Sequence, residues 1–391
     1  MPTMISGTTQ GHMQTQSILS NQRVVDMADK IYLLEPNSAP LYVLVSKLNK
    51  RVAINTTVEW LEDELNPSWT TLAVSAHSAD TVLSASAAYF NKYDLVKIPV
   101  TGEIVLVTAV TNTAVTVTRS VGTGTYSTAA ASAAAAADLV IIGSAFAEGS
   151  SSTDLTTLST KTARAFNYLQ IFRKSVEISK TLANSELYGG DDRSYQRKKK
   201  GIELMRDMER SFLFGEASED TTNIRRTTGG IDEFIQTNAT GAGGTLTETE
   251  FEGFLRTVFR YGSNTRYLFS APIVLSVISM WAQGKINMFS KDKTYGIAIS
   301  QYTSPHGTIN LVKELMLENA GGVSSTSYYG GYAFAIELEE VVYRYLQNRD
   351  IQFETEIQSP GDDFYKDQYI CEVGMEFHQE RKHGVLTGVT G

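Results

Sequence analysis

Apolar residues spaced three and four apart predict one long helix in the middle of the chain. It covers residues 191–214, with aspartates at its first turn and Gly215 after its last. A helix of that length spans roughly 36 Å, about twice the usual length in globular proteins. Its apolar stripe is formed by Gly201, Leu204, Met205, Met208 and Phe212. We therefore expect a rod with one buried face.

A second group of elements follows the long helix in quick order. Thr247 and Glu250 form a capping-box pattern at the start of a helix, and Pro272 opens another helix that runs to Trp281. A strand at 267–270 separates these two helices. Helix, strand and helix in this order predict a compact α/β lobe.

Alternating apolar and polar residues predict strands on both sides of the helices. Before the long helix, strands are expected at 95–100, 103–110, 114–119, 139–143 and 166–178. After it, we expect a hairpin of 295–302 and 308–317 and further strands at 330–338, 352–357 and 368–377. The first four strands are short, closely spaced and separated by turn residues, so they predict a small antiparallel β module.

Charge density separates this module from the rest of the chain. Residues 65–160 hold nine charged side chains, about 9% of that stretch against about 23% elsewhere. Such a shift indicates an inserted module that must lie against a neighbour or cover its own surface. Residues 1–51 show little periodicity, apart from a short helix expected around Leu41, Val45 and Leu48, and we expect an extended arm there.

Composition excludes several classes of protein. Lys and Arg total 34 and Asp and Glu total 43, and the resulting charge of −9 argues against a strongly basic nucleic-acid binder. The single cysteine, Cys371, excludes an internal disulfide and a cysteine-based zinc site. The first twenty residues carry no Lys or Arg, unlike a secretion signal. The most apolar stretch, 271–281, is shorter than the ~20 residues that a membrane span needs. We expect synthesis in the cytoplasm and no membrane association.

Catalytic and cofactor-binding spacings are absent from the sequence. The five histidines lack a zinc-binding spacing, and there is no nucleophile elbow or phosphate-cradling loop. Gly241–Gly244 precedes a helix but has the wrong spacing for a phosphate loop, so we interpret it as an ordinary loop. The acidic runs at 62–64 and 362–363 are interpreted as solvated surface. We therefore expect no enzyme, no cofactor and no bound metal.

One basic run is a candidate contact site. Arg197, Lys198, Lys199 and Lys200 occupy a full turn early in the long helix, so their side chains point in all directions. A solvated helix end is the simpler interpretation. The helix dipole does not favour cations near the N-terminus, however, and this favours a contact with phosphate groups or an acidic partner.

The order of these segments resembles the major capsid proteins of tailed bacteriophages with the Hong Kong 97-type fold. The segments that carry the resemblance are NYLQIFRKSVEIS (167–179), ELMRDMERSFLFG (203–215), RRTTGGIDEFI (225–235) and EVGMEF (372–377). Two pieces of the module, VTVTRSVGTGT (115–125) and IIGSAFAEGS (141–150), are similar to an insertion in one branch of these proteins. The resemblance covers nearly the whole chain.

This resemblance implies an α+β fold and a division into domains. Residues 1–51 would be the N-terminal arm and 52–152 the extended loop, enlarged by the inserted β module. Residues 153–224 would be the peripheral domain with the spine helix 191–214. Residues 225–335 would be the axial domain, and 336–391 would return to the peripheral domain with C-terminal strands.

The resemblance also implies function and partners. The chain would self-assemble as hexamers and pentamers into an icosahedral or prolate head shell around double-stranded DNA. It would be made in the host bacterial cytoplasm and reside in the virion. Because the sequence begins with Met1 and lacks a long helical segment ahead of the arm, we expect a separate scaffolding protein rather than a cleaved propeptide. A portal and decoration proteins are further candidate partners. Arg197–Lys200 would contact the genome or the scaffold from the inner wall.

Two other classes of protein stay open at the level of sequence. One is a different virion structural protein, such as a tail tube or sheath component, because the β module alone would suit it. The other is an enzyme with an unrecognised site. A buried carboxylate or histidine pair in one cleft would support the enzyme.

Overall fold

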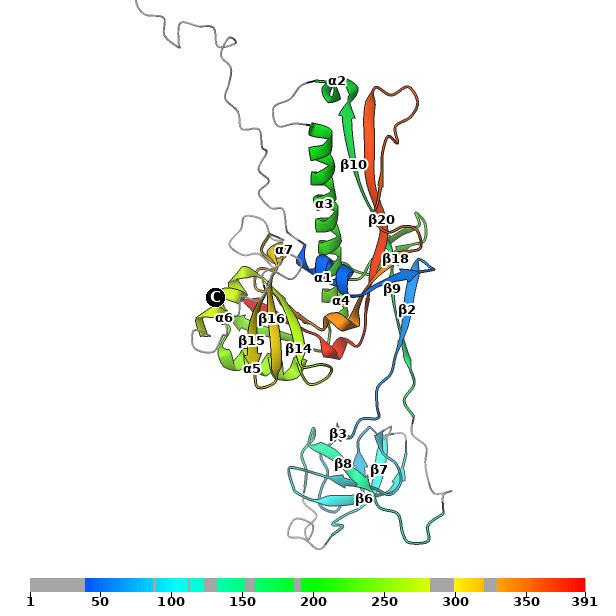
Figure 1. Ribbon diagram of the computed structural model, residues 1–391. Helices are drawn as coiled ribbons and strands as arrows, with labels where there is room; N and C mark the ends of the chain where they lie inside the picture. The colour runs from blue at the N-terminus through cyan, green and yellow to red at the C-terminus, as the bar shows by residue number, and fades with distance from the viewer. Residues whose placement is uncertain are drawn as a thin grey trace, which may run out of the picture. The chain divides into compact units, whose positions relative to one another are not determined.

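The computed structural model describes residues 39–86, 89–111, 113–122, 132–151, 159–185, 191–281, 299–319 and 329–390. The chain forms two compact units. Unit 1 combines the residues up to Trp60 with those from Phe166 onward, and unit 2 is the stretch Leu61–Ala165 between them. Helices and strands are mixed along the chain, as expected for an α+β protein (Figure 1). Most of the predicted arm, residues 1–38, lies outside the described residues.

A long antiparallel pair of strands runs through unit 1. β10 (Gln170–Ser179) pairs along its whole length with β20 (Phe364–Phe377). The strand order of this sheet is β1-β18-β20-β10, and β19 also pairs with β20. Residues 370–377 are all buried, so both faces of β20 are covered, whereas the sequence pattern predicted one apolar face. The other strands are β1 (Lys50–Ala53), β18 (Val341–Leu346) and β19 (Gln352–Glu354).

The predicted long helix is α3 (Asp192–Phe214), which runs alongside β10 and β20 (Figure 1). Asp191 caps it by accepting hydrogen bonds from the first-turn N–H groups of Arg193 and Ser194. Leu204, Met208 and Phe212 are fully buried, as the stripe predicted, whereas Met205 of the same stripe is 37% exposed. Each of the three buried side chains stabilises the fold by about 1.5–3 kcal/mol. The helix ends at Gly215, where a Cβ would lie 2.4 Å or less from two backbone oxygens.

The remainder of unit 1 is the predicted α/β lobe, a name we use for residues 231–336 together with the last strand. Its six-stranded mixed sheet has the order β13-β21-β17-β14-β16-β15. The strands are β13 (Ala239–Gly244), β14 (Thr265–Ser270), β15 (Ile299–Ser304), β16 (Gly307–Lys313), β17 (Ala333–Ile336) and β21 (Gly384–Val389). The helices are α4 (Ile231–Phe234), α5 (Glu248–Val258), α6 (Pro272–Trp281) and α7 (Leu315–Asn319).

The lobe confirms some sequence predictions and corrects others. The capping box is present: Thr247 accepts from the N–H of Glu250, and the Glu250 carboxylate accepts from the N–H of Thr247. The prediction of a loop at Gly241–Gly244 was wrong, because this stretch pairs with β21 as part of β13. Residues 315–317 form helix α7 instead of extending the preceding strand. β21, within the range 336–391 assigned to the peripheral domain, pairs with β13 and β17 of the lobe.

One hydrophobic core joins the lobe to α3 and the long strands. Helix α1 (Pro40–Leu48) contributes Leu41 and Leu44, which are buried in the same cluster as Met208 of α3 and Met375 of β20. The short helix predicted in this region is therefore confirmed. It lies within the predicted arm, 1–51, and packs the end of that segment against unit 1.

Unit 2 is a six-stranded antiparallel sheet that closes on itself, in the order β3-β8-β5-β6-β7-β4. A bridge between Leu72 and Ala85 joins the two end strands, and the N–H of Ala73 bonds to the oxygen of Ser84 at 2.8 Å. Closure leaves no long unpaired edge. The strands are β3 (Trp69–Thr71), β4 (Val82–Ser84), β5 (Asp94–Lys97), β6 (Ile104–Val110), β7 (Ala114–Thr118) and β8 (Asp138–Ser144). Fourteen of its described residues form a core that is separate from the core of unit 1.

The compact unit lies later in the chain than the predicted range 52–152. β1 belongs to the sheet of unit 1, because it pairs in parallel with β18. After it, β2 (Thr57–Glu62) pairs with β9 (Ala163–Tyr168), so the chain enters and leaves the module through two paired strands. The remaining short elements are α2 (Lys180–Ala183), β11 (Ser218–Asp220), β12 (Arg225–Thr227) and the 3-10 turns Leu338–Glu340 and Glu380–Lys382.

Candidate interaction surfaces

The basic turn of α3 divides into two paired and two exposed cations. Arg197 donates from Nε to Asp367 Oδ2 at 2.8 Å, and Lys200 bonds to a glutamate three residues further along at 2.6 Å. Lys198 and Lys199 are exposed. Across the part of the chain that the structure describes, neither of these two lysines has an ion-pair partner. The free positive charge of the turn is therefore concentrated on two adjacent side chains.

Asp367 on β20 holds the start of α3 in place. Its carboxylate accepts from Arg193 Nε at 2.9 Å and Nη2 at 2.8 Å, from Arg197, and from the backbone N–H of Glu356 at 3.0 Å. Burial alone would raise the pKa of Asp367, but these hydrogen bonds outweigh burial and hold the pKa well below its usual range. No local sequence pattern indicates this cluster, because its arginines and its carboxylate are more than 160 residues apart.

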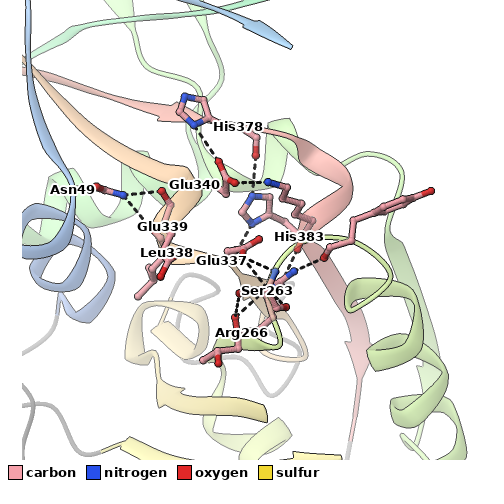
Figure 2. A network of polar contacts seen from close by, with 12 residues as sticks. Asn49, Ser263, Arg266, Glu337, Leu338, Glu339, Glu340, His378 and His383 are labelled. Carbon is pink, nitrogen blue, oxygen red and sulfur yellow. Dashed lines mark hydrogen bonds and ion pairs between the residues drawn. The ribbon is translucent and has the colours of Figure 1, made fainter. Parts of the chain in front are cut away.

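A buried arginine organises the polar network between the lobe and the end of β20 (Figure 2). Arg266 on β14 is fully buried. Its Nη2 donates to the oxygen of Tyr261 at 2.6 Å, its Nη1 to the oxygen of Ser263 at 2.7 Å, and its Nε to the oxygen of Lys382 at 3.0 Å. Glu337 lies 3.3 Å from its Nη1. These contacts compensate the burial of the guanidinium and fix the loop after α5 against the C-terminal segment.

Two histidines extend this network, and their pKa values are shifted in opposite directions. His383 Nδ1 accepts from the N–H of Glu337 at 3.2 Å, and its Nε2 contacts the oxygen of His378 at 3.1 Å. Burial lowers the pKa of His383 to about 3, so this imidazole is neutral. The hydrogen bond between His378 Nε2 and the accepting Glu376 Oε1, at 2.7 Å, raises the pKa of His378. Figure 2 shows His378 on the far side of Glu340, and its ring lies 6.0 Å from that of Trp60.

Unit 2 contains a buried ion pair that the sparse charge of the module did not lead us to predict. Glu103 is fully buried and accepts from Arg119 Nε at 2.8 Å and Nη2 at 2.5 Å. It also accepts from the N–H of Ser120 at 3.1 Å. Arg119 donates in addition to the backbone oxygen of His77 at 2.7 Å. The pair therefore joins the residue before β6 to the residue after β7, and Arg119 extends the link to the loop at His77.

The outer face of unit 2 carries exposed apolar side chains. Trp69 on β3 is 46% exposed and is paired in register with Val140 on β8. Ile142, two positions further along β8, is 53% exposed. Side chains two apart on a strand share a face, so Val140 and Ile142 lie beside Trp69 on one surface. This surface is suited to burial against another protein.

The described residues contain no group of three or more His, Cys, Asp or Glu side chains placed to hold a metal ion. Burial raises the pKa of the Cys371 thiol to about 12, so it is a packed, unreactive side chain. Among the described helices, none combines the length and the apolar character that crossing a bilayer requires.

Comparison with known proteins assigns the family. The family model described as SU10 major capsid protein matches residues 6–390. The capsid of a native GTA particle aligns with a TM-score of 0.50 at 8% identity, covering 96% of this chain and 97% of that chain. A chain of Mycobacterium phage Bobi aligns with a TM-score of 0.50 at 6% identity, covering 97% and 100%. At such low identity these structures show a shared fold. No curated protein sequence matches the chain. Because the family model spans nearly all of the sequence, the chain belongs to the SU10 major capsid protein family and is a self-assembling, shell-forming subunit of a tailed-bacteriophage head with the Hong Kong 97-type fold.

Proposed function

We propose that hexamers and pentamers of this chain enclose double-stranded DNA and that Lys198 and Lys199 face the packaged genome. The exposure of both side chains, without an ion-pair partner among the described residues, carries the proposal. Arg197 and Lys200 are left out of the contact because carboxylates of the same chain already neutralise them. Two lysines on one turn would bind phosphate without base specificity, in a salt-dependent manner.

A DNA-binding titration of purified capsomers tests this role. Each phosphate contact contributes about −0.9 to the slope of log K against log salt, so a Lys198→Gln, Lys199→Gln double variant should reduce the slope by about 1.8. A matched double variant at the exposed Lys97 and Lys313 removes the same charge elsewhere and should leave the slope unchanged. An unchanged slope in the first variant contradicts the proposal. Loss of scaffold binding with an unchanged DNA slope would identify an acidic scaffold as the partner.

Unit 2 is assigned, as part of the same proposal, to the extended loop with its inserted module. Its exposed Trp69 and Ile142, together with its low charge, support burial of this surface against a neighbouring subunit. The lobe would be the axial domain, and α3 with the β10–β20 sheet would be the peripheral domain. Residues 1–51 would be the N-terminal arm.

The remaining partners follow from the role in the shell. A separate scaffolding protein would direct assembly, a portal would occupy one vertex, and decoration proteins are candidates for the outside. Synthesis in the host cytoplasm would precede incorporation into the virion. We assign no catalytic role, and the unreactive environment of Cys371 is consistent with that assignment. The family match gives no support to a tail tube or sheath component.

A further inference from the structure

Helix α1 lacks a local cap and is capped from elsewhere in the chain. Ala39, the residue before its first turn, makes no side-chain hydrogen bond to the helix. The first N–H groups of a helix have no partner within it and need an acceptor. Glu209 of α3 supplies this acceptor, because its Oε1 lies 2.8 Å from the N–H of Leu41 and its Oε2 2.6 Å from that of Tyr42. One carboxyl group thus joins helix α1, at the end of the N-terminal segment, to the long helix α3.

A second carboxyl group from the lobe meets the first. Glu314, between β16 and α7, lies within interaction range of Glu209, and both side chains are fully buried. Two carboxylates cannot hydrogen-bond to each other without a proton between them. Glu314 Oε1 also accepts from the N–H of Met316 at 2.9 Å, whereas its Oε2 accepts no bond from the described residues. One proton shared between the two carboxyl groups would satisfy such a contact.

Among the residues that the structure describes, neither carboxyl group of the pair forms an ion pair with a cation. Burial raises the pKa of Glu209 well above its usual range, and the charge of Glu314 adds to this effect. Burial likewise raises the pKa of Glu314 to about 6. Burial raises the pKa of Tyr42 to about 12, so it stays neutral throughout the range of interest. The other titratable side chains of α1, and those within four residues of Glu209 or Glu314 along the chain, are Lys47, Arg206, Asp207, Arg210, Lys313 and Glu318.

We propose that Glu209 and Glu314 form a proton-sharing latch that holds α1 against the long helix and the lobe, and that the latch opens as the pH rises. When α1 detaches, water reaches both carboxyl groups, and the shared proton is released. Groups whose pKa is raised in the closed state stabilise it at low pH and lose that effect as the pH rises through the raised pKa. The latch thus makes the attachment of helix α1 to unit 1 sensitive to pH. The pair is not an active site, because no substrate can reach two fully buried groups whose oxygens contact backbone N–H groups.

Hydrogen exchange of the full-length protein tests the latch. The readout is the protection of the peptide 40–48, corrected for the intrinsic pH dependence of exchange. In the unaltered protein, protection should fall by up to about tenfold per pH unit between pH 6 and 8, the limit for one released proton. In Glu314→Gln the shared proton is no longer needed, and protection should stay constant over this range. Glu318→Gln is the control, because it removes an exposed charge from the same segment. Its protection should depend on pH as steeply as in the unaltered protein.

A second variant separates the latch from general destabilisation. Glu209→Gln keeps one acceptor for the two N–H groups of α1, so protection should be lower at every pH and should not depend on pH. A flat profile in the unaltered protein would overturn the proposal, as would an undiminished slope in Glu314→Gln. Failure of Glu314→Gln to fold would also overturn it, because the amide keeps the size of the side chain and removes the repulsion.

Discussion

The ion pair between Glu103 and Arg119 predicts that unit 2 can be destabilised without disturbing unit 1. Both groups are nearly or fully removed from water, with side-chain exposures of 0% and 8%. Removing one partner of a buried pair leaves the other charge uncompensated and costs about 3–5 kcal/mol. Glu103→Gln retains an oxygen that can accept from Arg119 or Ser120, so we expect about 3 kcal/mol, the lower end of that range.

This loss is large relative to the stability of a module of this size. A domain of about 100 residues has a free energy of unfolding of about 5–15 kcal/mol. Each kcal/mol shifts the Tm of such a domain by about 4–8 °C, so Glu103→Gln should lower the Tm of unit 2 by at least ~12 °C. Because the core of unit 2 is separate, the transition of unit 1 should not move.

Differential scanning calorimetry of the full-length protein measures both transitions. Asp138→Asn, which removes an exposed carboxylate from the same closed sheet, is the matched control and should change the Tm of unit 2 by less than ~3 °C. Glu103→Gln combined with Arg119→Met should recover much of the loss, since the unpaired charge is gone. If Glu103→Gln changes the Tm of unit 2 no more than the control does, the buried ion pair does not stabilise unit 2 as stated. The prediction also fails if a single transition of the whole chain moves instead.

Three further outcomes are expected. Gly374→Ala should destabilise unit 1 by about 1–3 kcal/mol in urea unfolding, because its Cβ would lie 2.8 Å from the backbone oxygen of Tyr168; unchanged stability would contradict the packing. The raised pKa of His378 means that its ion pairs stabilise unit 1 at low pH and weaken as the pH rises, so Trp60 fluorescence should titrate with a midpoint above 6.5 and lose that titration in His378→Asn. Deleting residues 62–164 behind a Gly-Ser linker should leave a folded, helical unit 1 that no longer closes into shells; an unfolded product would place the module in the core, and normal shells would make it dispensable.

Local patterns in the sequence predicted the elements that are stabilised locally. α3 and α6 begin and end near the predicted residues, and α5 begins at the predicted capping box, because their caps and apolar stripes lie within a few positions of one another. The module was recognisable for a similar reason, since its strands are neighbours in sequence. The strand predicted at 166–178 is instead two strands, interrupted at Leu169, whose N–H bonds to the oxygen of Thr56 at 2.8 Å. A partner more than a hundred residues away causes this break, and no local pattern encodes it.

The polar contacts that position the candidate surfaces could not be predicted from the sequence for the same reason. Charge runs indicated Arg197–Lys200 as one basic feature, but Asp367, 170 residues later, neutralises Arg197 and leaves the exposed charge on Lys198 and Lys199. The acceptor for α1 lies 168 residues beyond Leu41. Sequence reasoning counts charges within a window, whereas the free charge of a surface depends on which carboxylates the fold brings to it. A shell subunit can offer to its neighbours and its contents only those charged side chains that are not already paired within the chain. Its contact sites are therefore better sought among residues that the fold leaves unpaired than among the most basic runs.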